Sequence, residues 1–383
     1  MRPRILLLST SLGLGGADRQ ILSLAHALLE HEYEARLVSM TGLGEMGSRA
    51  VADGLPIMSL EMQRGRADRA SFQRLVHLLR GWRPHLLTSF MYHANLFGRV
   101  AGKWAGVPLI VTSIRSERNE SVARDWLMRL TNWMDDACTT NSRQVADSLG
   151  RRGLLPSSKI TVIPNGVDVA AFQAPPDTRV RVRAELGVKP AEFVWLAIGR
   201  LLPQKDYPTM LRAFQPLSGA RLLIAGRGPL LEQLKQLAEQ LGLGARVSFL
   251  GVREDIAELL AAADALVLSS AWEGMPNVVM ESLAAGRPVV ATQVGGVSEL
   301  VTHDVSGWTV VPRDPGALSQ AMERMMRLPA ERRREMGLQG QRHVAQEYSL
   351  ETMARRWMTL YRTLLQERGL PVAASAATPI TSV

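Results

Sequence analysis

Short apolar runs alternate with amphipathic helical patterns along the chain, and this alternation limits the fold more than any other feature of the sequence. In the first half the strand-type runs are at residues 5–8, 35–39, 56–60, 85–88, 109–112, 137–140 and 160–163. Helical patterns separate them near residues 17–30, 68–82, 95–105, 122–134 and 142–150. The second half repeats the alternation, with runs at 193–199, 221–225, 247–250, 265–268, 289–291 and 308–310. Such alternation predicts parallel sheets with helices on both faces, the doubly wound α/β class.

The length of 383 residues favours two domains, because a single hydrophobic core rarely grows so large. A turn signal, Asn165-Gly166, follows the last strand-type run of the first half. The expected parts are an N-terminal domain at 1–168, a linker with a short helix at 169–191, a second domain at 192–348, a C-terminal helix at 349–369 and a disordered tail at 370–383.

The chain carries an excess of positive charge, with a formal net charge of +9 and a sequence pI of about 10.2. It should attract anions, but its arginines are scattered, so nucleic acid is not an expected partner. No apolar run approaches the roughly 18 residues of a membrane span, and Ser9, Thr10 and Ser11 end the first run too early for a signal peptide. Together with the single cysteine, Cys138, these features predict a cytoplasmic protein.

Two charged segments have more than one explanation. Residues 64–83 hold the densest arginines, namely Arg64, Arg66, Arg69, Arg74, Arg80 and Arg83. They are either the solvated outer face of a packed helix or a surface for peripheral docking to anionic lipid at the inner membrane face. The pair Asp135-Asp136 could in principle hold a metal, but its place between a helix and a strand predicts a surface position. We expect neither a metal nor a cofactor.

One stretch, residues 269–292, combines an anion site with two acids. An apolar strand-type run ends in the loop Trp272-Glu273-Gly274-Met275, which opens directly into a helix with Pro276 at its first position. Free backbone N–H groups and the positive end of the helix dipole favour a phosphate there. Glu273 on the loop and Glu281 one turn into the helix could accept hydrogen bonds from hydroxyls. A ligand that carries phosphates beside sugar hydroxyls fits both features, and a nucleotide sugar is such a ligand.

The same stretch resembles the retaining glycosyltransferases of family 4. Glu273 and Glu281 match the E-x7-E motif of that family, within the surrounding run from Glu273 to Thr292. The resemblance covers nearly the whole chain. It implies the GT-B fold, two facing Rossmann-like domains with a C-terminal helix that crosses back to the first. It also implies transfer of a sugar from a UDP- or GDP-sugar to a glycan or lipid-linked acceptor hydroxyl, with retention of configuration, in bacterial polysaccharide, lipopolysaccharide or glycolipid assembly.

Loops after the strands of the second half supply the other expected donor contacts. Arg200 and Lys205 on one loop can clamp a diphosphate and neutralise the charge of the leaving group, and they match the family's diphosphate-binding residues. In this scheme Glu281 holds the ribose or phosphate region. Glu273 binds sugar hydroxyls, although a role as covalent nucleophile stays possible. Further expected contacts to the donor are Gly226, Gly228, Arg253, Gly274, Met275, Pro276, Asn277 and Val278. For Gly226 and Gly228 a tight turn explains the residues equally well.

The first half supplies fewer candidates. Gly15 and Gly16 match a Gly-Gly loop that faces the donor in the family. Many relatives have a histidine after the strand at 109–112, where this chain reads Ser113 to Arg118. His93 and Arg115 are therefore the candidates for contact with the reacting sugar. Two alternatives to the transferase stay open, a sugar-nucleotide epimerase of the same fold and a non-catalytic nucleotide-sugar-binding partner.

Overall fold

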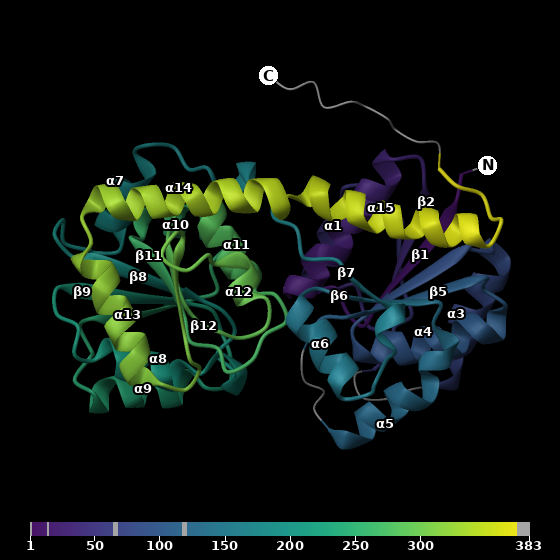
Figure 1. The fold of residues 1–383 in the computed structure, drawn as a ribbon, viewed down its shortest axis with the longest axis horizontal. Helices are drawn as coiled ribbons and strands as arrows, with labels where there is room; N and C mark the ends of the chain where they lie inside the picture. The colour runs from purple at the N-terminus through teal and green to yellow at the C-terminus, as the bar shows by residue number, and fades with distance from the viewer. Residues whose placement is uncertain (1, 14, 64–67, 117–120, 374–383) are drawn as a thin grey trace. The chain divides into compact units, whose positions relative to one another are not determined.

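The computed structural model describes residues 2–13, 15–63, 68–116 and 121–373. Arg64, Arg66, the sequence at 117–120 and the predicted tail from residue 374 onward lie outside the described residues. The chain divides into two compact units (Figure 1): unit 1 is Met1–Gly166 with Leu350–Val383, and unit 2 is Val167–Ser349. The predicted linker at 169–191 falls within unit 2, where it contains two short helices.

Unit 1 is built on a seven-stranded parallel sheet with strand order β3-β2-β1-β4-β5-β6-β7. The strands are β1 (Arg4–Ser9), β2 (Glu34–Ser39), β3 (Ile57–Ser59), β4 (Leu86–Phe90), β5 (Leu109–Ile114), β6 (Ala137–Thr140) and β7 (Ile160–Val162). The helices are α1 (Gly16–Glu30), α2 (Gly44–Ala52), α3 (Arg69–Trp82), α4 (Tyr92–Ala105), α5 (Val122–Thr131), η1 (Asn132–Met134), α6 (Arg143–Arg151), η2 (Ser157–Lys159) and α15 (Leu350–Glu367). Every predicted strand of the first half is confirmed, but the sequence reading missed α2.

Unit 2 repeats this plan with a six-stranded parallel sheet of order β10-β9-β8-β11-β12-β13. Its strands, all predicted, are β8 (Phe193–Ile198), β9 (Ala220–Ala225), β10 (Val247–Gly251), β11 (Ala265–Leu268), β12 (Val289–Thr292) and β13 (Gly307–Val310). Its helices are η3 (Ala170–Phe172), α7 (Thr178–Glu185), η4 (Pro203–Lys205), α8 (Tyr207–Phe214), α9 (Leu231–Gln240), α10 (Ile256–Ala262), α11 (Asn277–Ala284), α12 (Val297–Leu300), α13 (Pro315–Arg327) and α14 (Ala330–Glu347).

The strand order in unit 2 reverses direction between β8 and β11, which are hydrogen-bonded neighbours. The crossovers on either side of such a switch point diverge, so the loops at the carboxyl ends of the two strands leave room for a ligand. In this chain those loops carry Arg200 and Lys205 after β8, and Glu273 after β11. The topology therefore accounts for why residues about 70 positions apart can share one site.

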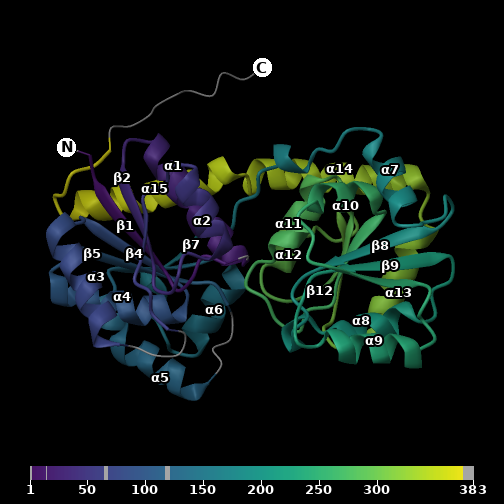
Figure 2. The ribbon, with the colours of Figure 1, turned by 180° about the vertical axis from the view of Figure 1, so that it is seen from behind.

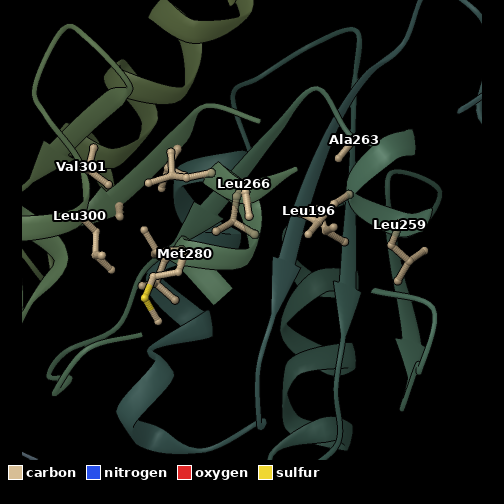
Figure 3. Close-up of a cluster of buried hydrophobic side chains, with 14 of the residues drawn as sticks. Leu196, Leu259, Ala263, Leu266, Met280, Leu300 and Val301 are labelled. Atoms are coloured by element: carbon tan, nitrogen blue, oxygen red, sulfur yellow. The ribbon is translucent and has the colours of Figure 1, made fainter. Parts of the chain in front are cut away.

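Side chains from the two faces of the unit 2 sheet enter separate cores. Val194 and Leu196 of β8 belong to one cluster, while Phe193, Trp195 and Ala197 belong to the other, as the alternation along a strand requires. Figure 3 shows the first cluster, with Leu196 of β8, Leu266 of β11 and Met280 of α11 among its members. The helix that carries Glu281 is thus anchored by Met280 to the core beneath the two loops.

The C-terminal helix α15 packs into the core of unit 1, as the resemblance predicted. Its inward stripe is Met353, Trp357, Tyr361 and Leu365, all buried in the same cluster as β1 and β5 side chains. The ring of Trp357 lies 5.4 Å from that of Phe90 at the end of β4, and the Tyr361 hydroxyl is 2.8 Å from the Thr88 hydroxyl. Figure 2 shows α15 alongside α1 from the opposite side.

The prediction that Asp135 lies at the surface is wrong. Its carboxylate is buried and paired with Arg99 of α4, whose Nε lies 2.8 Å from Asp135 Oδ1 and whose Nη2 contacts Oδ2. The Thr112 hydroxyl donates to Asp135 Oδ2 at 2.9 Å, and Arg99 Nη1 donates to the Thr131 hydroxyl at 2.9 Å. A buried charge is tolerated when it is paired and fully hydrogen-bonded, and this network ties α4 to β5 and to the end of α5.

Across the described part of the chain, every helix falls short of the combined length and apolarity that crossing a bilayer requires.

Candidate functional site

The loop after β8 presents Arg200 to solvent and turns Lys205 inward. Arg200 is exposed, and among the described residues its guanidinium forms no hydrogen bond or ion pair. The chain then makes the short helix η4 and a left-handed turn at Asp206, with φ of +45°. The buried Tyr207 hydroxyl donates to the Gly199 carbonyl at 3.1 Å, which fixes the start of the loop. Burial and the charge of Glu273 raise the pKa of Tyr207, so this donor keeps its proton.

Lys205 and Glu273 meet at the switch point of the sheet. Lys205 Nζ lies 2.5 Å from Glu273 Oε1, and both side chains are largely buried. The two loops are held together by their backbones as well, since Ala271 N–H donates to the Gln204 carbonyl at 2.8 Å. The structure therefore brings together Lys205 and Glu273, two of the residues expected to bind the donor.

Two further donors surround the Glu273 carboxylate. The Ser270 hydroxyl donates to Oε1 at 2.7 Å, and Gln204 Nε2 lies 3.4 Å from Oε2 and 3.0 Å from the Trp272 carbonyl. Neither Ser270 nor Gln204 was singled out from the sequence. Their place on the loops after β11 and β8 is the signal that was available, because side chains at the carboxyl ends of neighbouring strands converge.

Glu281 lies on α11, the helix that opens directly from the Glu273 loop. The helix begins at Asn277, with Pro276 as the residue before it, so Glu281 is one turn from its start. Its side chain is buried, as are Gly274, Met275 and Pro276, whereas Asn277 and Val278 are partly exposed. The accessible part of the predicted phosphate cradle is therefore its first helical turn.

Several glycines shape the two loops through close backbone packing. A Cβ on Gly226 would lie 2.0 Å from the Gly199 carbonyl oxygen, and one on Gly228 would lie 2.3 Å from that of Leu201. Gly295 has φ of +53°, and its Cβ would come within 2.4 Å of the Gly274 carbonyl oxygen. These positions bring the loops after β9 and β12 against the Arg200 and Glu273 loops. Gly295 was not predicted from the sequence.

Arg253, one of the expected donor contacts, follows β10 and pairs with Asp255. Its Nε donates to Asp255 Oδ1 at 2.7 Å, and Nη2 contacts Oδ2. Hydrogen bonding with Asp255 raises the pKa of Arg253, and hydrogen bonding with Arg253 lowers the pKa of Asp255. The side chain is thus occupied with its own loop, which leaves main-chain groups for a ligand.

In unit 1, Gly15 and Gly16 lie at the start of α1, after β1. The Gly15 N–H donates to Asp18 Oδ2 at 3.1 Å, and a Cβ on Gly15 would lie 2.9 Å from the same oxygen. A carboxylate of the chain itself therefore satisfies one N–H of this helix start. Gly16 is exposed.

His93 lies in the first turn of α4, after β4. Its ring is exposed and stands edge-on to that of Tyr92, with centroids 5.3 Å apart. The residue before the helix, Met91, has φ of 75° and ψ of 157°, a region that normally only glycine occupies. Such strain is typical of functional positions, and it could not be predicted from local sequence.

Arg115 follows β5 and is partly buried. Its Nη2 contacts Asn165 Oδ1, Nη1 donates to the Ser113 hydroxyl at 3.3 Å, and the guanidinium carbon lies 5.4 Å from the centre of the Phe90 ring. Burial lowers the pKa of Arg115 to about 10, so the group remains charged at neutral pH. Asn165 thus has a definite structural partner in the same unit.

Comparison with known proteins gives two family matches and a set of related sequences. Residues 15–166 match the glycosyl transferase 4-like domain, and residues 179–343 match glycosyl transferases group 1. The chain is 29% identical over 273 residues to the UDP-Gal:alpha-D-GlcNAc-diphosphoundecaprenol alpha-1,3-galactosyltransferase of Escherichia coli, covering 67% of this chain and 70% of that protein. It is 29% identical over 321 residues to the lipopolysaccharide core biosynthesis glycosyltransferase LpsD of Rhizobium meliloti, covering 84% and 87%.

Solved structures with the same fold include Anabaena HepE, with a TM-score of 0.84 and 22% identity over 95% of this chain and all of that one. WaaG, a glycosyltransferase of lipopolysaccharide biosynthesis, superposes with a TM-score of 0.71 and 17% identity over 92% and 98%. These neighbours share the GT-B fold that the resemblance implied. With family matches to both units, the chain belongs to the group 1 glycosyltransferases of the family 4 type.

Proposed function

We propose that this glycosyltransferase moves a hexosyl group from a UDP-sugar to a hydroxyl of a lipid-linked or glycan acceptor, with retention of anomeric configuration. The observation that carries the proposal is the meeting of Lys205 and Glu273 at the β8–β11 switch point, with the exposed cation Arg200 on the Lys205 loop. A cation for the diphosphate and an acid for sugar hydroxyls are both needed to hold a nucleotide sugar.

Arg200 and Lys205 would stabilise the diphosphate as negative charge builds on it during departure. Glu273 would hold sugar hydroxyls. Its Oε1 already accepts hydrogen bonds from Lys205 and Ser270, and a carboxylate oxygen engaged in this way is a weak nucleophile. This favours the binding role over a covalent intermediate. Glu281, one turn into α11, would hold the ribose or the phosphates.

The names of relatives support the substrate classes. The Escherichia coli relative is named for UDP-Gal and an acceptor linked to undecaprenol through diphosphate, and LpsD is named for lipopolysaccharide core synthesis. HepE has been crystallised with UDP, with UDP and glucose, and with UDP-glucose. The first two of these names are those of transferases, so they do not favour the epimerase or the non-catalytic alternative. A lipid-linked acceptor would place the enzyme in the cytoplasm at the inner membrane face.

A donor screen by titration calorimetry over UDP-, GDP- and ADP-sugars tests the donor, and NMR of the product's anomeric proton tests the stereochemistry. The proposal expects a UDP-sugar to bind most tightly and the product to keep the donor's anomeric configuration. Tighter binding of another nucleotide class, or an inverted product, would contradict the corresponding part.

A further inference from the structure

Helix α5 of unit 1 exposes most of its apolar side chains to solvent. An amphipathic helix in a folded domain normally turns its apolar stripe toward the core. Of the ten residues of α5, only Met128 is fully buried. Val122, Trp126 and Leu130, spaced four residues apart, are 75%, 58% and 60% exposed, and Trp133 of the adjoining η1 is 66% exposed. We call Val122, Trp126, Leu130 and Trp133 the α5 patch.

The position of α5 makes this surface accessible from the outside of unit 1. In both views α5 lies on the side of α4 that faces away from the sheet (Figures 1 and 2). Its inner side is held to the unit by Met128 and by the contact of Thr131 with Arg99. Exposed apolar residues are ordinary when scattered, but two tryptophans and two aliphatic residues along one helix edge indicate an interaction surface.

Among the described residues, the charges on α5 favour contact with anions. Asp125, the one carboxylate in the α5 sequence, is paired with Arg152. Arg129 lies 6.0 Å from the Trp126 ring centre and donates only to the Gly153 and Arg152 carbonyls within the described residues, so no carboxylate there cancels its charge. The whole chain carries a net charge of +9.

We propose that the α5 patch is the surface by which the enzyme docks on a bilayer containing anionic lipid. Tryptophan rings settle at the boundary between head groups and acyl chains, and arginine beside them is attracted to lipid phosphate. The inference extends the proposed function and rests on it in one respect, because only a lipid-linked acceptor requires the enzyme to reach a membrane. The docking surface also differs from the one suggested by the arginines at 64–83. Helix α3 buries Leu75, Val76 and Leu79 in the core, so these side chains cannot enter a bilayer.

A second copy of the chain fits the α5 patch less well than a bilayer. A ten-residue helix is about 15 Å long, which is short for the roughly 1,200 Å² or more of a stable protein interface. A two-fold pairing would also bring Arg129 of each copy toward the same region, where like charges repel, whereas anionic head groups attract them.

Co-sedimentation of the full chain with vesicles tests the proposal. Wild type should bind vesicles of phosphatidylglycerol and phosphatidylcholine more tightly than vesicles of phosphatidylcholine alone, and the difference should shrink in high salt. The double variant Trp126→Ser, Trp133→Ser should lower the partition coefficient at least about tenfold, because the rings supply most of the apolar area of the patch. Val122→Ser should weaken binding, whereas Val180→Ser on α7, at a valine 73% exposed beside Arg179 and Arg181, should not.

Equal vesicle binding by wild type and the double tryptophan variant would overturn the proposal. Wild type that binds anionic vesicles no more tightly than neutral ones would do the same. So would light scattering that shows a wild-type dimer broken by the same variant. UDP-sugar binding measured without vesicles keeps the two ideas separate. UDP-sugar binding should be unchanged in the tryptophan variant. If wild type does not bind a UDP-sugar, the proposed donor is wrong, and vesicle binding still tests the α5 patch.

Discussion

Removing one member of the buried Arg99–Asp135 pair should destabilise unit 1 strongly. The side chains are 2% and 0% exposed, so Asp135→Ala leaves a guanidinium without its counterion in a site where water cannot replace it. Thr131 and Thr112 remain near Arg99 as neutral hydrogen-bond partners. Breaking a pair of this kind typically costs about 3–5 kcal/mol, a large part of the roughly 5–15 kcal/mol that stabilises a domain.

Replacing both members should cost much less than the two single changes together. In Arg99→Met, Asp135→Leu no unpaired charge is left and the volume is kept approximately, so we expect a loss of about 0–2 kcal/mol. In a cycle with Arg99→Met and Asp135→Leu as the single variants, each costing at least about 3 kcal/mol, the coupling free energy is about 4 kcal/mol or more. A matched surface pair provides the control, since Arg49→Ala, which removes the partner of the exposed Glu45, should change stability by about 0.5 kcal/mol or less.

Hydrogen exchange of peptides from β5 and β6 is the suitable assay, because a chain of two units need not unfold in one transition. Asp135→Ala should accelerate exchange in these strands far more than the double variant does. Strands β9 and β12 of unit 2 serve as an internal reference. Additive effects, with the double variant losing as much stability as the two single variants together, would show that Arg99 and Asp135 do not act as a unit.

Three further predictions concern local structure. Met91→Gly should raise the free energy of unfolding by about 1 kcal/mol. Glycine relieves a backbone strain of about 1–3 kcal/mol, and its greater freedom in the unfolded chain offsets part of this gain. A lower melting temperature of the variant would contradict this prediction. Gly295→Ala should weaken UDP-sugar binding at least about tenfold in calorimetry, because its Cβ would press on the Gly274 carbonyl. Asp68 caps α3, and the backbone N–H of Ser71 is the main cause of its lowered pKa. A lowered pKa gives stability above the ordinary value of 3.8 that is lost as pH falls, so the melting-temperature gap between wild type and Asp68→Ala should close in acid.

Much of the fold was predictable because buried parallel strands are read from local sequence. Every strand run appears as a strand. The crossing of α15 was implied by the family resemblance, and Trp357 and Tyr361 pack in the core of unit 1. Helix α2 was missed because it has only nine residues, includes glycines at 44 and 47, and buries no large apolar side chain, only Gly47 and Ala50. Length and large apolar side chains, not importance, decided which helices could be recognised.

Contacts between distant segments explain the rest. Nothing next to Asp135 in the sequence reveals that Arg99, 36 positions away, allows it to be buried. Ser270 and Gln204 were likewise missed around Glu273, since ordinary polar residues gain meaning only from the loop opposite. The positive φ of Met91 has no sequence signature either. The roles assigned to Arg200, Lys205, Glu273, Glu281, His93 and Arg115 are predictions that mutation has to test.

We propose that Lys205 binds the diphosphate of the donor and that Glu273 binds its sugar, and calorimetry that compares UDP with a UDP-sugar measures the two contacts separately. Lys205→Met should weaken both ligands at least about tenfold, since both carry the diphosphate. Glu273→Gln should weaken the UDP-sugar alone and leave UDP binding equal or tighter, because Lys205 loses its partner in the free protein. If Glu273→Gln weakens UDP binding as much as UDP-sugar binding, or Lys205→Met leaves UDP binding intact, these two residues do not have the proposed roles.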